Sequence, residues 1–436
     1  MSEFPFGFNP GPGGEQGPAD LAAAFTQLGR LLSWQGGPVN WDLARDVARQ
    51  VSAQSPDPSV GTADREPLLE AWRLAELWLD DACAFPSAGP RVSAWSRAEW
   101  IEATIPAWQE LVEPVAAKVV DSLGTLLSGQ GSDNPLQRLG LPVEQVQAFA
   151  AMAGPLQQVM RTLGGAMFGT QVGQAIGSLS TEVLGSTDVG IPLAAPGTAA
   201  LLPANIAAFG AGLGIPDDQI RLYLALREAA HQRLFAHAPW LRSHLVGAVG
   251  AYARGITVDV ARLEGLVGQI DPADPASLQE AMSSGMLEPE DTPEQRAALQ
   301  RLETALALVE GWVDEVVDGA AAAHLPSAGA LRETMRRRRA TGGPAEQTFS
   351  SLVGLELRPR RLRDAAALWR SVLEQRCQSG REAVWAHPDL LPGADDLDDP
   401  AGFAARPALG GDGTWDLAGL DDSPAPPEDP EEGTRQ

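Results

Sequence analysis

The five residues Arg227-Glu228-Ala229-Ala230-His231 have types and a spacing that could carry out chemistry. They match the helical motif H-E-x-x-H, in which two histidines one turn apart hold a zinc ion and the glutamate takes a proton from the metal-bound water. Glu228 occupies the base position and His231 the position of the second ligand. Arg227 stands in place of the first histidine, and it cannot act as a ligand because its guanidinium group stays protonated. The motif therefore predicts a hydrolase scaffold with zinc as cofactor, and Arg227 argues against both zinc binding and activity.

Two acidic residues downstream could complete a metal site. Glu310 lies in an apolar stretch with helical spacing, and Asp314 falls one turn later on the same face. In one class of zinc proteases the third ligand is a glutamate on a helix that follows the motif helix, so Glu310 has the expected type and order. The alternative is that Arg227 pairs with carboxylates such as Glu228 and Glu310, and that its charge takes the place of the metal charge.

His237 is a further candidate ligand. It follows His231 by six residues, which is the separation of the third ligand in the extended motif H-E-x-x-H-x-x-G-x-x-H. That motif needs a glycine to turn the chain, and Leu234 stands there instead. The alternative is a histidine at a helix end that faces the C-terminal dipole.

Apolar residues recur at helical spacing along most of the chain, which predicts a mainly α fold. The expected helices span about 19–54 with a break at 34–38, 64–83, 95–127, 216–237, 242–254, 293–322, 326–340 and 358–386. Asn40 is a plausible N-cap for the restart after the break. Strands are expected only at 188–193 and 199–209, as a small β-sheet or hairpin next to the motif helix.

Glycines recur every four residues at Gly165, Gly169, Gly173 and Gly177. On a helix they form one smooth stripe that lets a second helix approach closely, which is also a feature of membrane helices. The polar side chains of this segment make it a poor membrane span. We therefore expect a tightly packed buried helix and no span.

The charge and the cysteine content exclude several classes of function. The net charge is −25, with 57 acidic and 32 basic residues, which argues against a nucleic-acid partner. The run Arg336–Arg339 is therefore interpreted as a solvated helix end or a docking site for an acidic tail. Cys83 and Cys377 do not suggest a disulfide framework. The N-terminus lacks the basic start and the apolar run of a signal peptide, so we expect a cytoplasmic protein.

The 436 residues suggest one large domain between two tails. Residues 1–18 form a Gly/Pro-rich tail and residues 393–436 an acidic tail, and both compositions predict disorder. The domain at 19–392 divides into an N-terminal helical part, about 19–150, and a motif-bearing part, about 151–392.

Over about residues 30–392 the chain resembles the actinobacterial zincin-like metallopeptidases, hydrolases related to proteins associated with coenzyme F420 biosynthesis. The stretches that carry the resemblance are 37–42, 95–100, 188–193, 227–240, 309–312 and 354–359. The resemblance implies a mostly α fold with a small sheet beside the motif helix. It also implies Glu228 as the base, with His231 and Glu310 as zinc ligands.

Two functions follow from these observations. The first is a zincin-like hydrolase of peptide or amide bonds whose degenerate site has Arg227 in place of the first zinc ligand. The second is a non-catalytic protein that binds a peptide or a protein, held along a strand edge. A structural role in assembly is a third alternative, and the sequence does not predict an oligomeric state.

Overall fold

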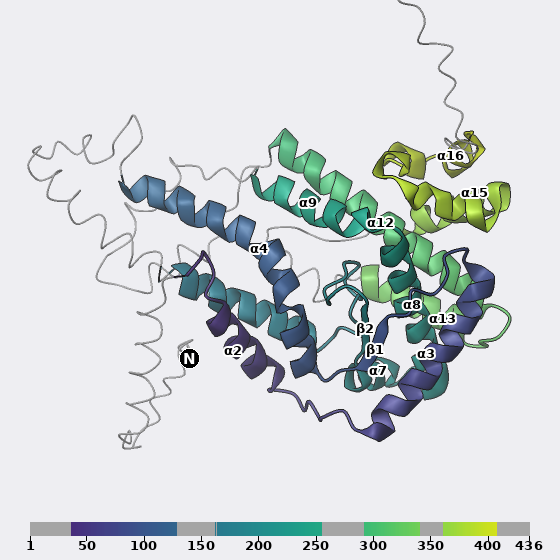
Figure 1. Ribbon diagram of the computed structural model, residues 1–436, viewed down its shortest axis with the longest axis horizontal. Helices are drawn as coiled ribbons and strands as arrows, with labels where there is room; N and C mark the ends of the chain where they lie inside the picture. The colour runs from purple at the N-terminus through teal and green to yellow at the C-terminus, as the bar shows by residue number, and fades with distance from the viewer. Residues whose placement is uncertain (1–35, 129–161, 163, 255–291, 341–360, 408–436) are drawn as a thin grey trace, which may run out of the picture.

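The computed structural model describes residues 36–128, 162, 164–254, 292–340 and 361–407, and most of them are helical (Figure 1). The helices are α2 (Trp41–Ser52), α3 (Thr62–Ala82), α4 (Arg97–Ser128), α7 (Pro203–Gly210), α8 (Asp217–His237), α9 (Trp240–Arg254), α12 (Pro293–Ala321), α13 (Ala328–Ala340), α15 (Leu362–Ala383) and α16 (Pro400–Ala405). The strands are β1 (Arg91–Ala94) and β2 (Thr198–Leu201). The predicted mainly α fold with a small sheet is confirmed.

The motif helix α8 lies inside the molecule, packed against α3 and α12 (Figure 1). Every residue from Leu222 to His231 is buried, so α8 has no solvent-exposed face over three turns. A helix that is buried all round is normally apolar. The polar residues of the motif therefore need partners inside the protein.

The predicted helix boundaries agree with local capping. Asn40 is the N-cap of α2, and its side chain accepts a hydrogen bond from the backbone nitrogen of Leu43 at 3.1 Å. At the start of α12, Thr292 and Gln295 form a reciprocal capping box. The predicted helices at 64–83, 95–127, 216–237, 242–254, 293–322 and 326–340 correspond to α3, α4, α8, α9, α12 and α13.

The glycine stripe lies on a helix over residues 164–180 and packs against α2. A β-carbon on Gly169 would lie 2.5 Å from the backbone oxygen of Asn40, and one on Gly173 would lie 2.5 Å from that of Ala44. The two helices approach so closely that only glycine fits, and the prediction of a tightly packed helix is confirmed. Among the described helices, none combines the length and apolar character that crossing a membrane requires.

The predicted strand positions are partly wrong. The sheet is parallel, with Arg91 paired to Thr198 and Ala94 to Leu201, so it is not a hairpin, and β1 was not predicted at all. Residues 188–193 form a loop with a turn at its start, and 203–210 is the helix α7. The physical reasons are local: Gly190 has a φ of +81°, which no strand residue adopts, and Pro203 suits the first turn of a helix.

The body of the protein continues past residue 392. A short 3₁₀ helix at Asp395–Leu397 and the helix α16 both pack on α15, and Leu397 and Phe403 are buried. Arg376 of α15 donates to the backbone oxygens of Phe403 and Ala404 at 2.6 and 2.9 Å. The predicted tail boundary at 393 is therefore too early, because this acidic segment also carries apolar anchors. Residues 1–18 and 408–436 lie outside the described residues.

Candidate functional site

The helices α8 and α12 bring the motif together with Glu310. The Nη2 group of Arg227 donates to Glu310 Oε2 at 2.7 Å, and His231 Nε2 lies 3.3 Å from Glu310 Oε1. All three residues are buried, with Glu310 only 1% exposed. Arg227 therefore forms a buried, charge-assisted ion pair with the candidate third ligand.

Glu228 is directed to the loop that precedes β2. Its carboxylate accepts from the Ser186 hydroxyl at 2.5 Å, from the Thr187 hydroxyl at 2.6 Å, and from the Thr187 backbone nitrogen at 3.2 Å. Gln232 donates to the same carboxylate at 3.1 Å. Gly185 makes room for this contact, because a β-carbon there would lie 2.5 Å from Glu228 Oε2. The loop thus satisfies the glutamate that the motif assigns as base.

A small cavity of about 20 Å³ lies next to these side chains. Its lining includes Gly185, Arg227, Glu228, His231 and, from α13, Met335. That volume accommodates about one water molecule. This cavity is too small to hold a peptide substrate.

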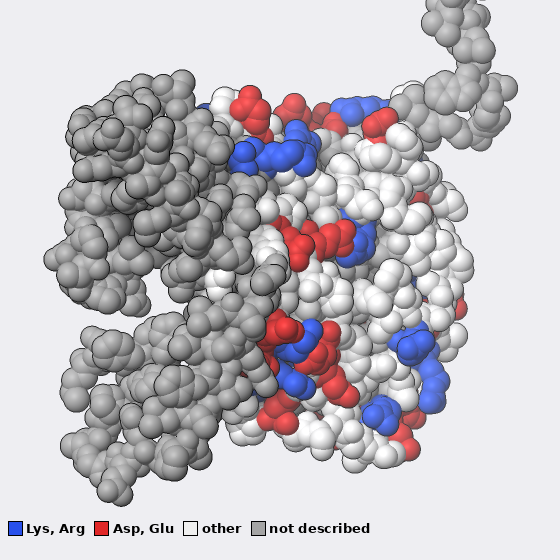
Figure 2. All heavy atoms as spheres, turned by 60° about the vertical axis from the view of Figure 1, so that its left-hand side comes forward, with Lys and Arg blue, Asp and Glu red and all other residues white. Residues whose placement is uncertain are grey.

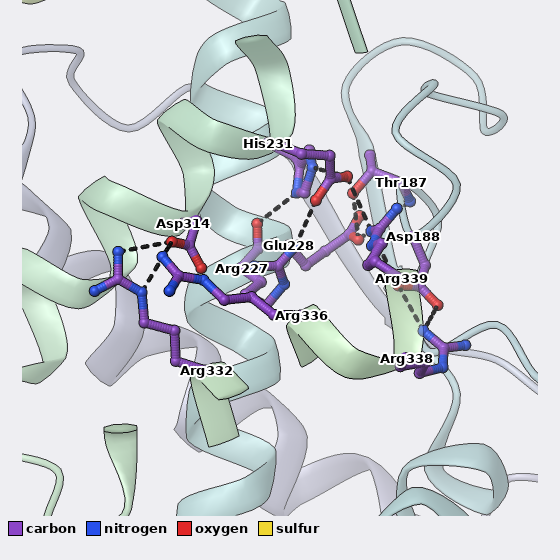
Figure 3. A network of polar contacts seen from close by, with 11 residues as sticks. Thr187, Asp188, Arg227, Glu228, His231, Asp314, Arg332, Arg336, Arg338 and Arg339 are labelled. Atoms are coloured by element: carbon purple, nitrogen blue, oxygen red, sulfur yellow. Dashed lines mark hydrogen bonds and ion pairs between the residues drawn. The ribbon is translucent and has the colours of Figure 1, made fainter. Parts of the chain in front are cut away.

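Arginines from α13 close the site from the other side (Figure 3). They pair with carboxylates that lie far away in the sequence: Arg336 with Asp314 at 2.6 Å, Arg338 with Asp188 at 3.0 Å, and Arg339 with Glu310 at 2.9 Å and with Asp188 at 3.5 Å. The result is one continuous cluster of arginines and carboxylates between α8, α12, α13 and the loop at 184–188.

The interpretation of Arg336–Arg339 as a solvated helix end or a tail-docking site is therefore wrong for most of the run. Within it, Arg337 is the exposed member and pairs with Glu333 one turn earlier. Asp188, which holds two arginines, was missed as a site residue. The helical spacing of Arg332, Arg336 and Arg339 on the face that carries Met335 indicates that these arginines face inward, but it does not identify Asp188 as their partner.

Two of the candidate ligands are not directed at the pair formed by His231 and Glu310. The carboxylate of Asp314 accepts from Arg332 and Arg336, both at 2.6 Å. His237 stacks on Phe85, with ring centroids 4.9 Å apart. It follows His231 by six residues, and on a straight helix that corresponds to about 9 Å along the axis.

Electrostatics keep the cluster ionised. Burial alone would raise the pKa of Glu310, but Arg339, Arg227 and the hydrogen bond from His231 hold it well below its usual range. The pKa of Asp188 is lowered in the same way, because Arg338 and Arg339 outweigh its burial. Both carboxylates therefore stay charged, and each has arginine partners.

His231 and Glu310 retain part of the arrangement of a metal site. The Nδ1–H group of His231 donates to the backbone oxygen of Arg227 at 2.8 Å, so that Nε2 faces Glu310. Such a bond to Nδ1 is what orients a metal-binding histidine. The 3.3 Å between Nε2 and Oε1 is close to the separation of two ligands on a tetrahedral zinc ion, about 3.4 Å from the usual bond lengths.

The complete set of side chains does not fit zinc. A catalytic zinc ion takes three protein ligands and a water molecule, whereas Arg227 contributes a positive charge where the third ligand would lie. Arg339 adds a second guanidinium group on Glu310 Oε1, the oxygen that faces His231. In the described part of the chain, no three His, Cys, Asp or Glu residues are grouped so as to hold a metal ion.

Comparison with known proteins agrees with this fold. The chain is similar to the crystal structure of a candidate hydrolase with a novel fold from Chloroflexus aurantiacus. The TM-score is 0.54 at 22% sequence identity, over 84% of this chain and 97% of the other, and this likeness establishes a shared fold. No curated protein matches the sequence. The sequence model for zincin-like metallopeptidases matches residues 39–404, which is most of the chain. The protein therefore belongs to the zincin-like metallopeptidase family.

Proposed function

We propose that this protein keeps the zincin-like scaffold without zinc-dependent catalysis, and that it acts by binding a peptide or a protein. The observation that carries the proposal is the buried ion pair between Arg227 and Glu310 at 2.7 Å, in the place where a first histidine ligand would be. The same proposal includes a cytoplasmic location. It also includes kinship with the actinobacterial members of the family and with proteins associated with coenzyme F420 biosynthesis.

The chemistry of the site supports the loss of hydrolysis. Two remaining ligands, His231 and Glu310, are fewer than the three that a catalytic zinc ion usually needs. Glu228 is engaged by the hydroxyls of Ser186 and Thr187, so its oxygens are not directed at a water molecule between the two ligands. A general base must lie within hydrogen-bond reach of the proton that it takes.

The outer edge of β1 supports a binding role. The N–H groups of Arg91 and Trp95 donate to the carbonyl oxygens of Gly197 and Leu201, on the β2 side of the strand. Successive N–H groups of a strand point to opposite sides, so those of Val92 and Ala94 point away from β2. Within the described residues, these two groups have no backbone partner. The far side of β2 is covered, because Ser186 donates to Ala200 at 3.0 Å. Val92 is partly exposed, whereas Ala94 is buried, so an extended segment could add to β1 as a third strand at its Val92 end.

The charge distribution supports a peptide or protein partner over a nucleic acid. On the face that Figure 2 shows, basic and acidic side chains lie next to one another, and no continuous basic area forms among the described residues. Nucleic-acid binding needs a continuous, positively charged surface.

Binding to short labelled peptides of alternating valine and threonine tests the proposal. Val92→Pro removes an outward N–H group without removing a bond to β2, so we expect peptide affinity to fall about tenfold or more while the circular dichroism spectrum is unchanged. Gly37→Ala, in open space outside the sheet, is the control and should bind like the parent. Chelator-sensitive cleavage of these peptides by the parent, or unchanged affinity of the Val92→Pro variant, would contradict the proposal.

A further inference from the structure

We infer that Arg339 is the second half of a protein-built substitute for the zinc ion. Together with Arg227, it gives Glu310 two positive charges, the charge that a divalent metal would have supplied. The inference rests on the proposed function, and it adds a residue that lies outside the motif helix. It also implies that two side chains, from two different helices, exclude zinc from this site.

The contacts on Glu310 carry the inference. Each of its oxygens has its own guanidinium partner: Arg227 donates to Oε2 at 2.7 Å, and Arg339 forms an ion pair with Oε1 at 2.9 Å. The Oε1 atom also faces His231 Nε2 at 3.3 Å, which is the separation expected of two zinc ligands. Arg339 therefore approaches the one ligand pair of the site that is still spaced for a metal ion.

The location of Arg339 explains how its charge is kept in the interior. Its side chain is 12% exposed, and it also pairs with Asp188 at 3.5 Å. Burial lowers the pKa of Arg339, while Glu310 and Asp188 act in the opposite direction, and an arginine stays protonated in proteins. Met335, one turn earlier on α13, is 2% exposed and anchors this helix against the cavity beside Glu228.

A consequence follows for restoring the motif. Arg227→His alone supplies the missing ligand, but it leaves a guanidinium group on the oxygen that zinc must bind. The cation would repel the metal ion, and it would compete for the same lone pairs. Removal of Arg339 is therefore needed as well, and it also makes room for the water that completes a four-coordinate site.

Zinc binding by three variants tests this inference, with zinc alone as the probe. Arg227→His, R227H/R339Q and R227H/R337Q are purified in the presence of zinc, and bound zinc and the zinc-dependent shift in unfolding temperature are measured. We expect R227H/R339Q to bind zinc at least about tenfold more tightly than Arg227→His. Arg337 is the matched control, because it belongs to the same run but pairs with Glu333 at the surface. R227H/R337Q should behave like Arg227→His.

Each other outcome counts against the inference. It is wrong if Arg227→His binds zinc as tightly as R227H/R339Q, or if R227H/R337Q gains as much affinity. It is also wrong if R227H/R339Q is folded and binds no zinc. Failure of R227H/R339Q to fold in the presence of zinc contradicts it too, provided that R227H/R337Q folds, because a ligand that binds the native state stabilises it. Stoichiometric zinc in the parent protein would instead overturn the proposed function.

Discussion

At the scale of single residues, Arg227 changes the chemistry of a whole cluster. A histidine at this position would add a lone pair beside His231 and Glu310, whereas the guanidinium group adds a fixed positive charge and hydrogen-bond donors. Its bond to Glu310 at 2.7 Å keeps a carboxylate charged that is only 1% exposed. At the position that the motif assigns to a ligand, this protein therefore has a buried ion pair.

Arg227→Ala should destabilise the protein by about 3 kcal/mol, the lower end of the cost of breaking a buried ion pair. The lower end applies because Arg339 still contacts Glu310 at 2.9 Å. The free energy of unfolding from urea titration measures the effect. Arg337→Ala, at an exposed position of α13, should change it by no more than about 0.5 kcal/mol. Equal effects of the two substitutions would show that the ion pair does not stabilise the fold.

Asp188 should make stability depend on acidity. Its folded-state pKa is lowered, so its contribution is present above the unfolded-state pKa of about 3.9 and is lost as the pH falls below that value. Asp188→Asn removes this contribution. Between about pH 6 and pH 3, the unfolding free energy of the variant should therefore fall less steeply than that of the parent. Parallel curves would contradict the assignment of this charge to the cluster.

At the scale of secondary-structure elements, the sequence predicts those helices whose positions follow from the local spacing of apolar and capping residues. The helices α3, α8 and α12 follow from apolar periodicity, and α2 begins where the Asn40 cap predicts. The stretch at 188–193 is apolar and resembles a strand, but Gly190 turns the chain and its neighbours form the loop that holds Glu228. β1 has only four residues, too few for a periodic signal.

The candidate site was predictable only in part. The order of Arg227, Glu228, His231 and Glu310 is visible in the sequence, because a known motif fixes it. The role of Arg339 is not, because a run of four arginines gives no indication of which distant carboxylates it meets. Those partners are set by how α13 packs across α8 and α12, a tertiary arrangement that no local pattern contains.

The packing of the glycine stripe on α2 gives a prediction at this scale. Gly173→Ala should destabilise the fold by about 1–3 kcal/mol, because its β-carbon would lie 2.5 Å from the backbone oxygen of Ala44. Gly247→Ala is the control on α9, where a β-carbon meets no atom of the described residues within 4 Å. There alanine should be neutral or stabilise the helix by up to about 1 kcal/mol. Thermal unfolding of both variants measures the difference, and a harmless Gly173→Ala substitution would refute the close helix contact.

At the scale of the whole molecule, the cluster adds buried ion pairs to the apolar contacts between parts of the chain that lie far apart in the sequence. It links α8 to α12 through Arg227, and α13 to both the loop at 184–188 and α12 through Arg338 and Arg339 (Figure 3). An ion network of this kind fixes the relative positions of three helices. In the function that we propose, this network takes the place of a metal ion at the centre of the fold.

The zinc content of the full chain tests most directly whether arginine has replaced the metal. The protein is purified after exposure to zinc, freed of unbound metal, and submitted to elemental analysis. We predict zinc on the order of a tenth of an equivalent per chain or less, because His231 and Glu310 alone cannot hold a catalytic ion against two guanidinium groups. Roughly one equivalent of zinc that disappears in a His231→Ala variant would contradict this account, since His231 would then be a working ligand despite Arg227.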